Sequence, residues 1–181
     1  MGMTRRALRM LPALALVGAL GGCGVERGLY YLATQRAMKV TTEGMLPTLK
    51  PGDRIMVDTT FYANNPVRRF DVIIFTQRPE NVPDVPGIDK DSPYVQRVVG
   101  LGGETVEVKG GEVYINGQWL AEPFATIAPV TREDYGPFKI PEGELFVMGD
   151  NRPNSYDSRH WPSPTLGKQQ IFGKVVQHFP Q

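Results

Sequence analysis

Residues 104–120, ETVEVKGGEVYINGQWL, indicate the fold class of this chain. Two short strand-like runs, residues 104–108 and 112–115, flank the pair Gly110-Gly111, which is the arrangement of a β-hairpin. Asn116-Gly117 favours a type I′ turn, because this dipeptide accepts the positive φ angles that such a turn requires. The stretch therefore predicts antiparallel strands joined by tight turns, with a further strand after residue 117.

Short strands are also predicted on both sides of this hairpin. Residues 78–93 contain four prolines, which cannot join the interior of a sheet, so we expect a surface loop there. No segment after residue 45 shows a helical period over ten residues. We predict an all-β fold of short antiparallel strands over residues 40–181, with a small inserted β-hairpin region. The other predicted strands are residues 54–57, 71–76, 94–99, 144–148 and 173–176.

The composition excludes several classes of protein. The 181 residues carry a formal net charge of +1, which gives no electrostatic basis for binding nucleic acid. A single cysteine excludes an intramolecular disulfide framework and a Cys-rich zinc site. Two histidines are too few for a metal site. We therefore predict neither a metal nor a cofactor.

The first 22 residues have the pattern of an export signal. Three arginines, at positions 5, 6 and 9, precede an apolar run over residues 10–20. A basic start followed by a short apolar run and small residues is typical of a secretory signal. The run is shorter than the ~20 apolar residues that a membrane-spanning helix needs. We predict a signal peptide over residues 1–22 and a membrane-proximal linker or short helix over residues 23–39.

The only cysteine, Cys23, directly follows this signal. The sequence Leu20-Gly21-Gly22-Cys23 resembles the lipobox of bacterial lipoproteins, which implies cleavage before Cys23 and lipid attachment to it. An uncleaved membrane anchor, or a cysteine placed there by chance, are the alternatives. Both the lipid and the anchor would hold the domain on the exported side of the cytoplasmic membrane, in the periplasm. Gly24, by resemblance to the lipoprotein sorting rule, favours the outer membrane.

Three further segments carry a resemblance to a known family. They are residues 44–49 (GMLPTL), 96–101 (QRVVGL) and 149–159 (GDNRPNSYDSR). In this order and at these spacings they resemble the conserved boxes of the type I signal peptidases. The resemblance implies an antiparallel β fold and a substrate bound as an extended strand, with small residues in shallow apolar pockets. It also implies a serine nucleophile with a lysine as general base.

Both reactive positions hold other residues in this chain. Matched to the family boxes, the nucleophile position is Gly44 and the base position is Gln96. Thr42 matches a family position whose hydroxyl helps to form the oxyanion hole. Thr42 lies two residues before the nucleophile position, which is about 7 Å away along an extended chain. Catalytic groups must lie within hydrogen-bond reach of each other, so Thr42 is too far away to replace the nucleophile. We predict that no catalytic residue is intact.

The resemblance implies that other residues of the site are retained. Asp157 and Arg159 match a pair that supports the site, and Asp150 begins the turn that carries them. Ser155 matches a serine that bonds the base, and here its partner would be the amide of Gln96. Arg97 matches an arginine of the family, and an arginine side chain does not serve as a general base. Met45 and Pro47 are expected to lie in the substrate groove.

We predict a catalytically inactive, membrane-tethered protein that keeps a groove for extended peptide segments with small residues. One alternative is an active peptidase that uses another nucleophile, such as Thr42. The other is an interaction protein that uses a different surface, such as the loop at residues 78–93 or the segment at residues 119–143.

Overall fold

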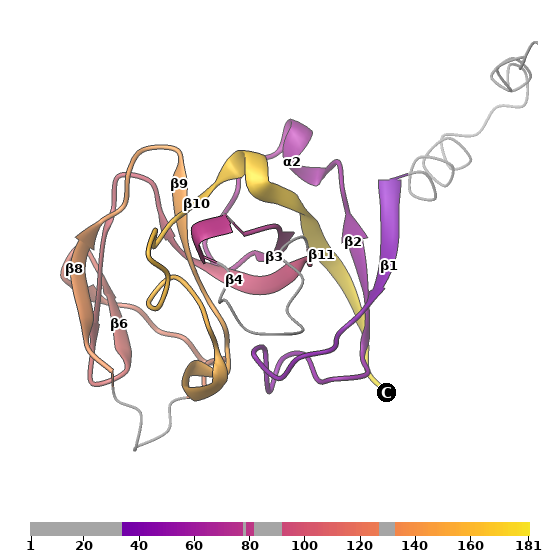
Figure 1. Ribbon diagram of the computed structural model, residues 1–181, viewed down its shortest axis with the longest axis horizontal. Coiled ribbons are helices and arrows are strands. Elements are labelled where there is room, and N and C mark those ends of the chain that lie inside the picture. Colours follow the sequence, from indigo (N-terminus) through magenta and orange to yellow (C-terminus); the bar gives the residue numbers. More distant parts are fainter. Residues whose placement is uncertain (1–33, 78, 82–91, 127–132) are drawn as a thin grey trace, which may run out of the picture. The chain divides into compact units, whose positions relative to one another are not determined.

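Two antiparallel sheets make up the part of the chain that the computed structural model describes, which is residues 34–77, 79–81, 92–126 and 133–181. The larger sheet has seven strands in the order β1-β2-β11-β3-β4-β9-β10, and the smaller has four in the order β7-β6-β5-β8 (Figure 1). All strand pairs are antiparallel, which confirms the predicted fold class.

The bounds of the elements are as follows. The larger sheet contains β1 (Gln35–Lys39), β2 (Arg54–Asp58), β3 (Val72–Phe75), β4 (Tyr94–Leu101), β9 (Glu144–Met148), β10 (Leu166–Gly167) and β11 (Ile171–Phe179). The smaller sheet contains β5 (Thr105–Lys109), β6 (Glu112–Ile115), β7 (Gln118–Trp119) and β8 (Tyr135–Lys139). The short helices are α2 (Phe61–Asn64), η1 (Pro79–Asn81), η2 (Arg152–Asn154) and η3 (Lys168–Gln170).

The hairpin predicted from residues 104–115 is present as β5 and β6. Val106 pairs with Ile115 and Lys109 with Glu112 across it. Asn116 and Gly117 have φ angles of 52° and 78°, so both residues take the left-handed conformation that the Asn-Gly pair favours. This turn leads into β7, so the smaller sheet is the inserted region that the sequence predicts.

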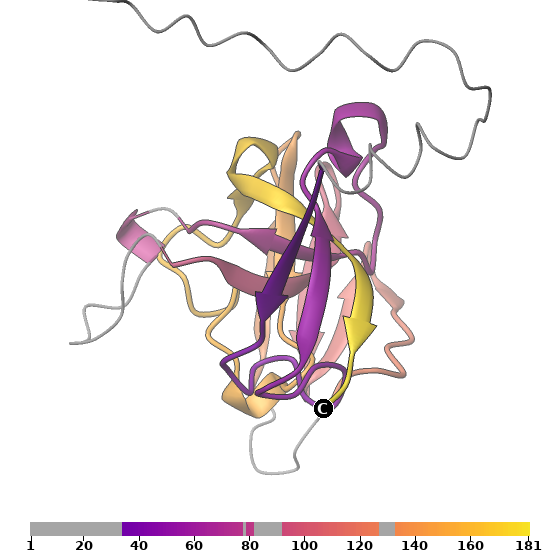
Figure 2. The ribbon, with the colours of Figure 1, turned by 90° about the vertical axis from the view of Figure 1, so that its right-hand side faces the viewer.

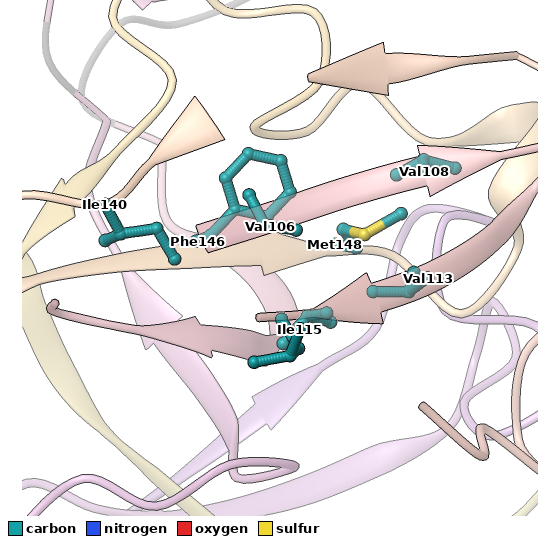
Figure 3. Close-up of a cluster of buried hydrophobic side chains, with 8 residues drawn as sticks. Val106, Val108, Val113, Ile115, Ile140, Phe146 and Met148 are labelled. Carbon is teal, nitrogen blue, oxygen red and sulfur yellow. The ribbon is translucent and has the colours of Figure 1, made fainter. Parts of the chain in front are cut away.

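The central strands β3, β4 and β9 of the larger sheet bury side chains on both faces. Alternate residues of one strand face opposite sides of a sheet, so a continuous apolar run indicates burial on both. Val98 and Val99 of β4 accordingly belong to different apolar clusters. The cluster that contains Val99 also contains residues of β5, β6 and β9 and therefore joins the two sheets (Figure 3). Its buried members are Val99, Val106, Val108, Val113, Ile115, Ile140, Phe146 and Met148.

The β domain begins earlier in the chain than predicted. Residues 35–39 form β1, an edge strand that pairs with β2 along its whole length, and Figure 2 shows the two side by side. The predicted linker over residues 23–39 is therefore wrong for its last five residues. The pattern QRAMK gives little signal because this edge strand has no fully buried side chain. Strand β8 was not predicted either, because its sequence, YGPFK, contains Gly and Pro.

Several sequence predictions lie outside the described residues. They are the signal peptide, Cys23 as a lipid attachment point, residues 23–33 of the linker, and most of the loop at residues 78–93. Within the residues that are described, no helix is long and apolar enough to cross a membrane.

Candidate functional site

A groove of ≈ 600 Å³ lies between three segments that are far apart in the sequence. One wall is the end of β1 with the residues that follow it, and the opposite wall is the start of β4. The third segment belongs to the turn after β9. Four predicted site residues, Thr42, Gly44, Gln96 and Ser155, line the groove. The other lining residues are Met38, Lys39, Val40, Thr41, Glu43, Ile55, Ile74, Ser92, Pro93, Tyr94, Val95, Asn154 and Tyr156.

Main-chain contacts hold the segment of Gly44 against the turn after β9. The N–H of Asn151 donates to Gly44 O at 3.0 Å, and its side-chain amide donates to Glu43 O at 3.0 Å. Gly149 makes this close approach possible, because a Cβ at this position would overlap Ser155 Oγ and Gly44 O. The first and third sequence boxes therefore form one surface of the groove.

Gly44 has room for a side chain. A Cβ placed on it would have one neighbour within 4 Å, Asn154 O at 3.8 Å, which is an ordinary van der Waals distance. Its backbone also lies outside the left-handed region that favours glycine. The local structure would thus accept a serine, and neither space nor backbone conformation requires glycine here.

Gln96 lies on β4 and is 5 % exposed. Its Nε2 donates to the main-chain O of Tyr156 at 2.9 Å, and its Oε1 has no hydrogen-bond partner among the described residues. The expected bond between Ser155 and the amide of Gln96 is therefore not formed. The carbonyl of Tyr156, one residue further along the chain, takes the Nε2 donor instead.

Arg97 and Asp150 form a buried ion pair behind the groove. Arg97 Nε lies 2.8 Å from Asp150 Oδ1, and Nη2 lies 2.6 Å from Oδ2, so the contact is bidentate. Arg97 Nη1 also donates to Phe70 O at 3.0 Å, and the guanidinium lies 3.9 Å from the centre of the Phe124 ring. The hydroxyl of Thr48 donates to Asp150 as well. These contacts fix the end of β9 to β4.

Asp157 and Arg159 form the ion pair that the sequence predicts. Arg159 Nε and Nη2 each lie 2.9 Å from a carboxylate oxygen of Asp157. Asp157 Oδ2 also accepts the N–H of Gly149 at 3.1 Å, and Arg159 Nη2 donates to Arg152 O at 2.8 Å. The pair therefore ties both ends of the turn that carries Ser155, which is a supporting role.

Two predicted groove residues lie elsewhere. Met45 does not line the groove; it is wholly buried in an apolar cluster with Leu49 and Val57. Pro47 is exposed and also lies outside the lining residues. In extended or turning backbone, neighbouring side chains point in different directions, so proximity to Gly44 in sequence did not place them in the groove.

Sequence reasoning missed three side chains that shape the groove. They are Lys39, Tyr94 and Tyr156. Lys39 was missed because β1 was not recognised as a strand. Tyr94 lies two residues before the second box and Tyr156 lies inside the third, but only the fold brings the third box beside the start of β4.

Among the described residues of the groove, no hydroxyl is hydrogen-bonded to a side chain that could act as its base. Its aliphatic hydroxyls belong to Thr41, Thr42, Ser92 and Ser155 and its phenolic hydroxyls to Tyr94 and Tyr156. In the described structure, no hydrogen bond connects any of them to the exposed Lys39. A serine-type nucleophile needs a base within hydrogen-bond reach to become reactive. Lys109 is 60 % exposed and pairs with Glu107 in the smaller sheet, and Lys90 lies outside the described residues.

The walls of the groove present main chain without strand partners. Residues 94–96 of β4 pair with β3 on one side, and the pairing with β9 on the other side begins only at Arg97. In the described structure, the main-chain groups of Thr41 and Thr42 also make no hydrogen bond. Free main-chain donors and acceptors at a strand edge are a template for an added extended segment.

His160 lies near two carboxylates, those of Glu133 and Asp157, and His178 lies against that of Asp53. His160 Nε2 is 3.0 Å from Glu133 Oε2, and His178 Nε2 is 2.7 Å from Asp53 Oδ2. Within the described ranges, no group of three or more His, Cys, Asp or Glu side chains is arranged to hold a metal ion.

Comparison with known proteins gives the family. The family model described as "Signal peptidase, peptidase S26" matches residues 8–179. The chain belongs to this family. It is 41 % identical over 145 residues to the signal peptidase I of Leptolyngbya laminosa, which covers 79 % of this chain and 68 % of that protein. It is 38 % identical over 140 residues to the probable signal peptidase I-1 of Synechocystis sp., which covers 77 % and 68 %.

A crystal structure of a signal peptidase I from Enterococcus faecalis V583 is also similar to this member of the family. The sequence identity is 28 % and the TM-score is 0.49, with 62 % of this chain and 98 % of that chain covered.

Proposed function

We propose that this chain is a signal peptidase family member that binds extended peptide segments with small residues and does not cleave them. One observation carries the proposal: the groove keeps its supporting contacts but lacks both reactive side chains. Its supporting contacts, Arg97 with Asp150 and Asp157 with Arg159, are complete. The two positions matched to the nucleophile and the base hold Gly44 and Gln96, neither of which can do that chemistry.

The size of the loss supports an inactive protein. Removing the nucleophile or the base of a serine protease lowers kcat by up to ~10⁶. An enzyme that turns over at ~10 s⁻¹ would then cleave about once per day, which is too slow to process exported proteins. Binding of an extended peptide needs main-chain hydrogen bonds and pockets, and it requires neither missing group.

The first prediction concerns binding. We expect a labelled signal-peptide-like segment with small residues to bind the purified chain and to remain intact. Tyr156→Ala should weaken binding about tenfold or more, since it removes an aromatic wall of the groove. Fluorescence anisotropy gives the Kd, and mass spectrometry of the same sample reports cleavage.

Trp119→Ala is the matched control for this experiment. Trp119 is 59 % exposed on β7 and Tyr156 is 39 % exposed, but only Tyr156 lines the groove. Equal binding by both variants and the unaltered chain would contradict the proposal that the peptide binds in this groove. Cleavage by the unaltered chain that Thr42→Ala abolishes would replace the proposal with an active peptidase.

The second prediction concerns attachment to the membrane. We propose that a lipid on Cys23 tethers the domain on the exported side of the cytoplasmic membrane. The mature protein is then expected to begin at Cys23 with an added lipid mass, and Cys23→Ser is expected to remove that mass. Mass spectrometry of the N-terminal peptide from membrane fractions tests this. Detection of residues 1–22 on the mature protein would instead support an uncleaved anchor.

A further inference from the structure

Tyr156 is a side chain of the groove wall that other residues hold in place. Its main-chain O accepts a hydrogen bond from Gln96 Nε2 at 2.9 Å. Its ring stacks on the imidazole of His160, with the ring centres 5.9 Å apart and the planes inclined by 19°. Burial raises the pKa of the Tyr94 hydroxyl, and the nearby hydroxyl of Tyr156 raises it further. Tyr156 is thus held at its main chain by β4 and at its ring by His160.

The imidazole of His160 is itself fixed by its neighbours. Nε2 lies 3.0 Å from Glu133 Oε2, and Nδ1 lies 3.5 Å from the main-chain N of Asp157. The main-chain N–H of His160 donates to Asp157 O at 2.8 Å. Asp157 in turn forms the ion pair with Arg159 that supports the groove. The ring that stacks on Tyr156 is therefore anchored to the buried support of the site.

A fixed ring in the groove wall favours binding. Tyr156 lines the groove and is 39 % exposed, so its ring is accessible to a bound peptide. A side chain that is free to change its rotamer must be ordered when a ligand packs against it, and this ordering weakens binding. Two stacked aromatic rings attract each other beyond the effect of the area that they bury. The stack with His160 therefore orders the ring before the peptide arrives.

Resting on the proposed function, we propose that His160 is a positioning residue of the groove, whose ring holds Tyr156 where the bound peptide contacts it. His160 is not among the residues that line the groove. It therefore acts on the peptide through Tyr156, and its contribution to binding depends on the presence of the Tyr156 ring.

Three substitutions of His160 separate the effect of its ring from that of its nitrogens. His160→Ala removes the ring, and we expect the Kd of a labelled signal-peptide-like segment to rise about fivefold. His160→Phe keeps a ring without the nitrogens and should restore most of the lost affinity. His160→Gln keeps a polar side chain without a ring and should bind as weakly as His160→Ala. Fluorescence anisotropy with the full chain measures each Kd.

A double-mutant cycle tests whether His160 acts through Tyr156. In the Tyr156→Ala background, His160→Ala should cause no further loss of affinity, because the ring that it positions is already absent. His178→Ala is the matched control. The side chains of His160 and His178 are both 31 % exposed and each lies against a carboxylate, but His178 is outside the groove. His178→Ala should leave the Kd unchanged.

Each outcome bears on a stated claim. Thermal unfolding identifies the variants that are folded, and if His160→Ala is not, the comparison of His160→Phe with His160→Gln decides. Unchanged affinity in folded His160→Ala, equal affinity of the Phe and Gln variants, or an undiminished loss in the Tyr156→Ala background would overturn the inference. Each of these results would leave the proposed function standing. Failure of the unaltered chain to bind the peptide would instead overturn the proposed function.

Discussion

The double variant Gly44→Ser, Gln96→Lys is expected to cleave a signal-peptide substrate that the unaltered chain leaves intact. A serine fits at position 44, where the Cβ meets only Asn154 O at 3.8 Å. Position 96 is 5 % exposed, and such burial lowers the pKa of a lysine toward the range in which it acts as a base. We expect a rate ~10²–10⁴ above that of the unaltered chain, the usual contribution of a positioned general base.

Single variants and a displaced lysine control this experiment. Gly44→Ser alone lacks the base and Gln96→Lys alone lacks the nucleophile, so both should remain at the background rate. Gly44→Ser with Gln177→Lys carries the same added groups but puts the amine on β11 outside the groove. A double variant that folds and binds peptide without cleaving would show that the groove no longer aligns a substrate with residues 44 and 96.

The second large effect is expected from the ion pair behind the groove. Arg97→Met leaves the carboxylate of Asp150 buried with the hydroxyl of Thr48 as its remaining side-chain partner. Breaking a buried pair from one side costs about 3–5 kcal/mol, which lowers the melting temperature of a domain of this size by about 6–20 °C. Differential scanning calorimetry measures the change.

An exposed pair serves as the control. Lys109 Nζ lies 2.9 Å from Glu107 Oε2, but Lys109 is 60 % exposed, so Lys109→Met should leave the melting temperature nearly unchanged. Arg97→Met combined with Asp150→Leu should recover part of the lost stability, because no carboxylate is then left unpaired. If Arg97→Met and Lys109→Met gave the same small change, the pair would not be the support described above.

The fold was largely predictable because its signals are local. The hairpin at residues 104–115 and the turn at Asn116-Gly117 follow from conformational preferences of neighbouring residues. The buried strands β3 and β9 follow from continuous apolar runs. Strand β1 could not be found in this way, since a polar edge strand is defined by its partner β2 and not by its own pattern.

The candidate site was predictable only in part. The ordered boxes identified Gly44, Gln96 and the Asp157–Arg159 pair, which the structure brings around one groove or its supporting turn. The bond from Gln96 to Tyr156 O and the burial of Met45 depend on how segments pack together, and that information is absent from any single box. The free acceptor on Gln96 appears only once these contacts are known.

The apolar cluster that joins the two sheets has a consequence for cooperativity. Phe146 and Met148 of β9 are buried in that cluster, and β9 leads within two residues to Asp150. Loss of the smaller sheet would expose these side chains to water and loosen the strand that carries the ion pair. Elements that share buried apolar contacts tend to open together. We therefore expect the inserted hairpin region and the groove to open together, although the hairpin lines no part of the groove.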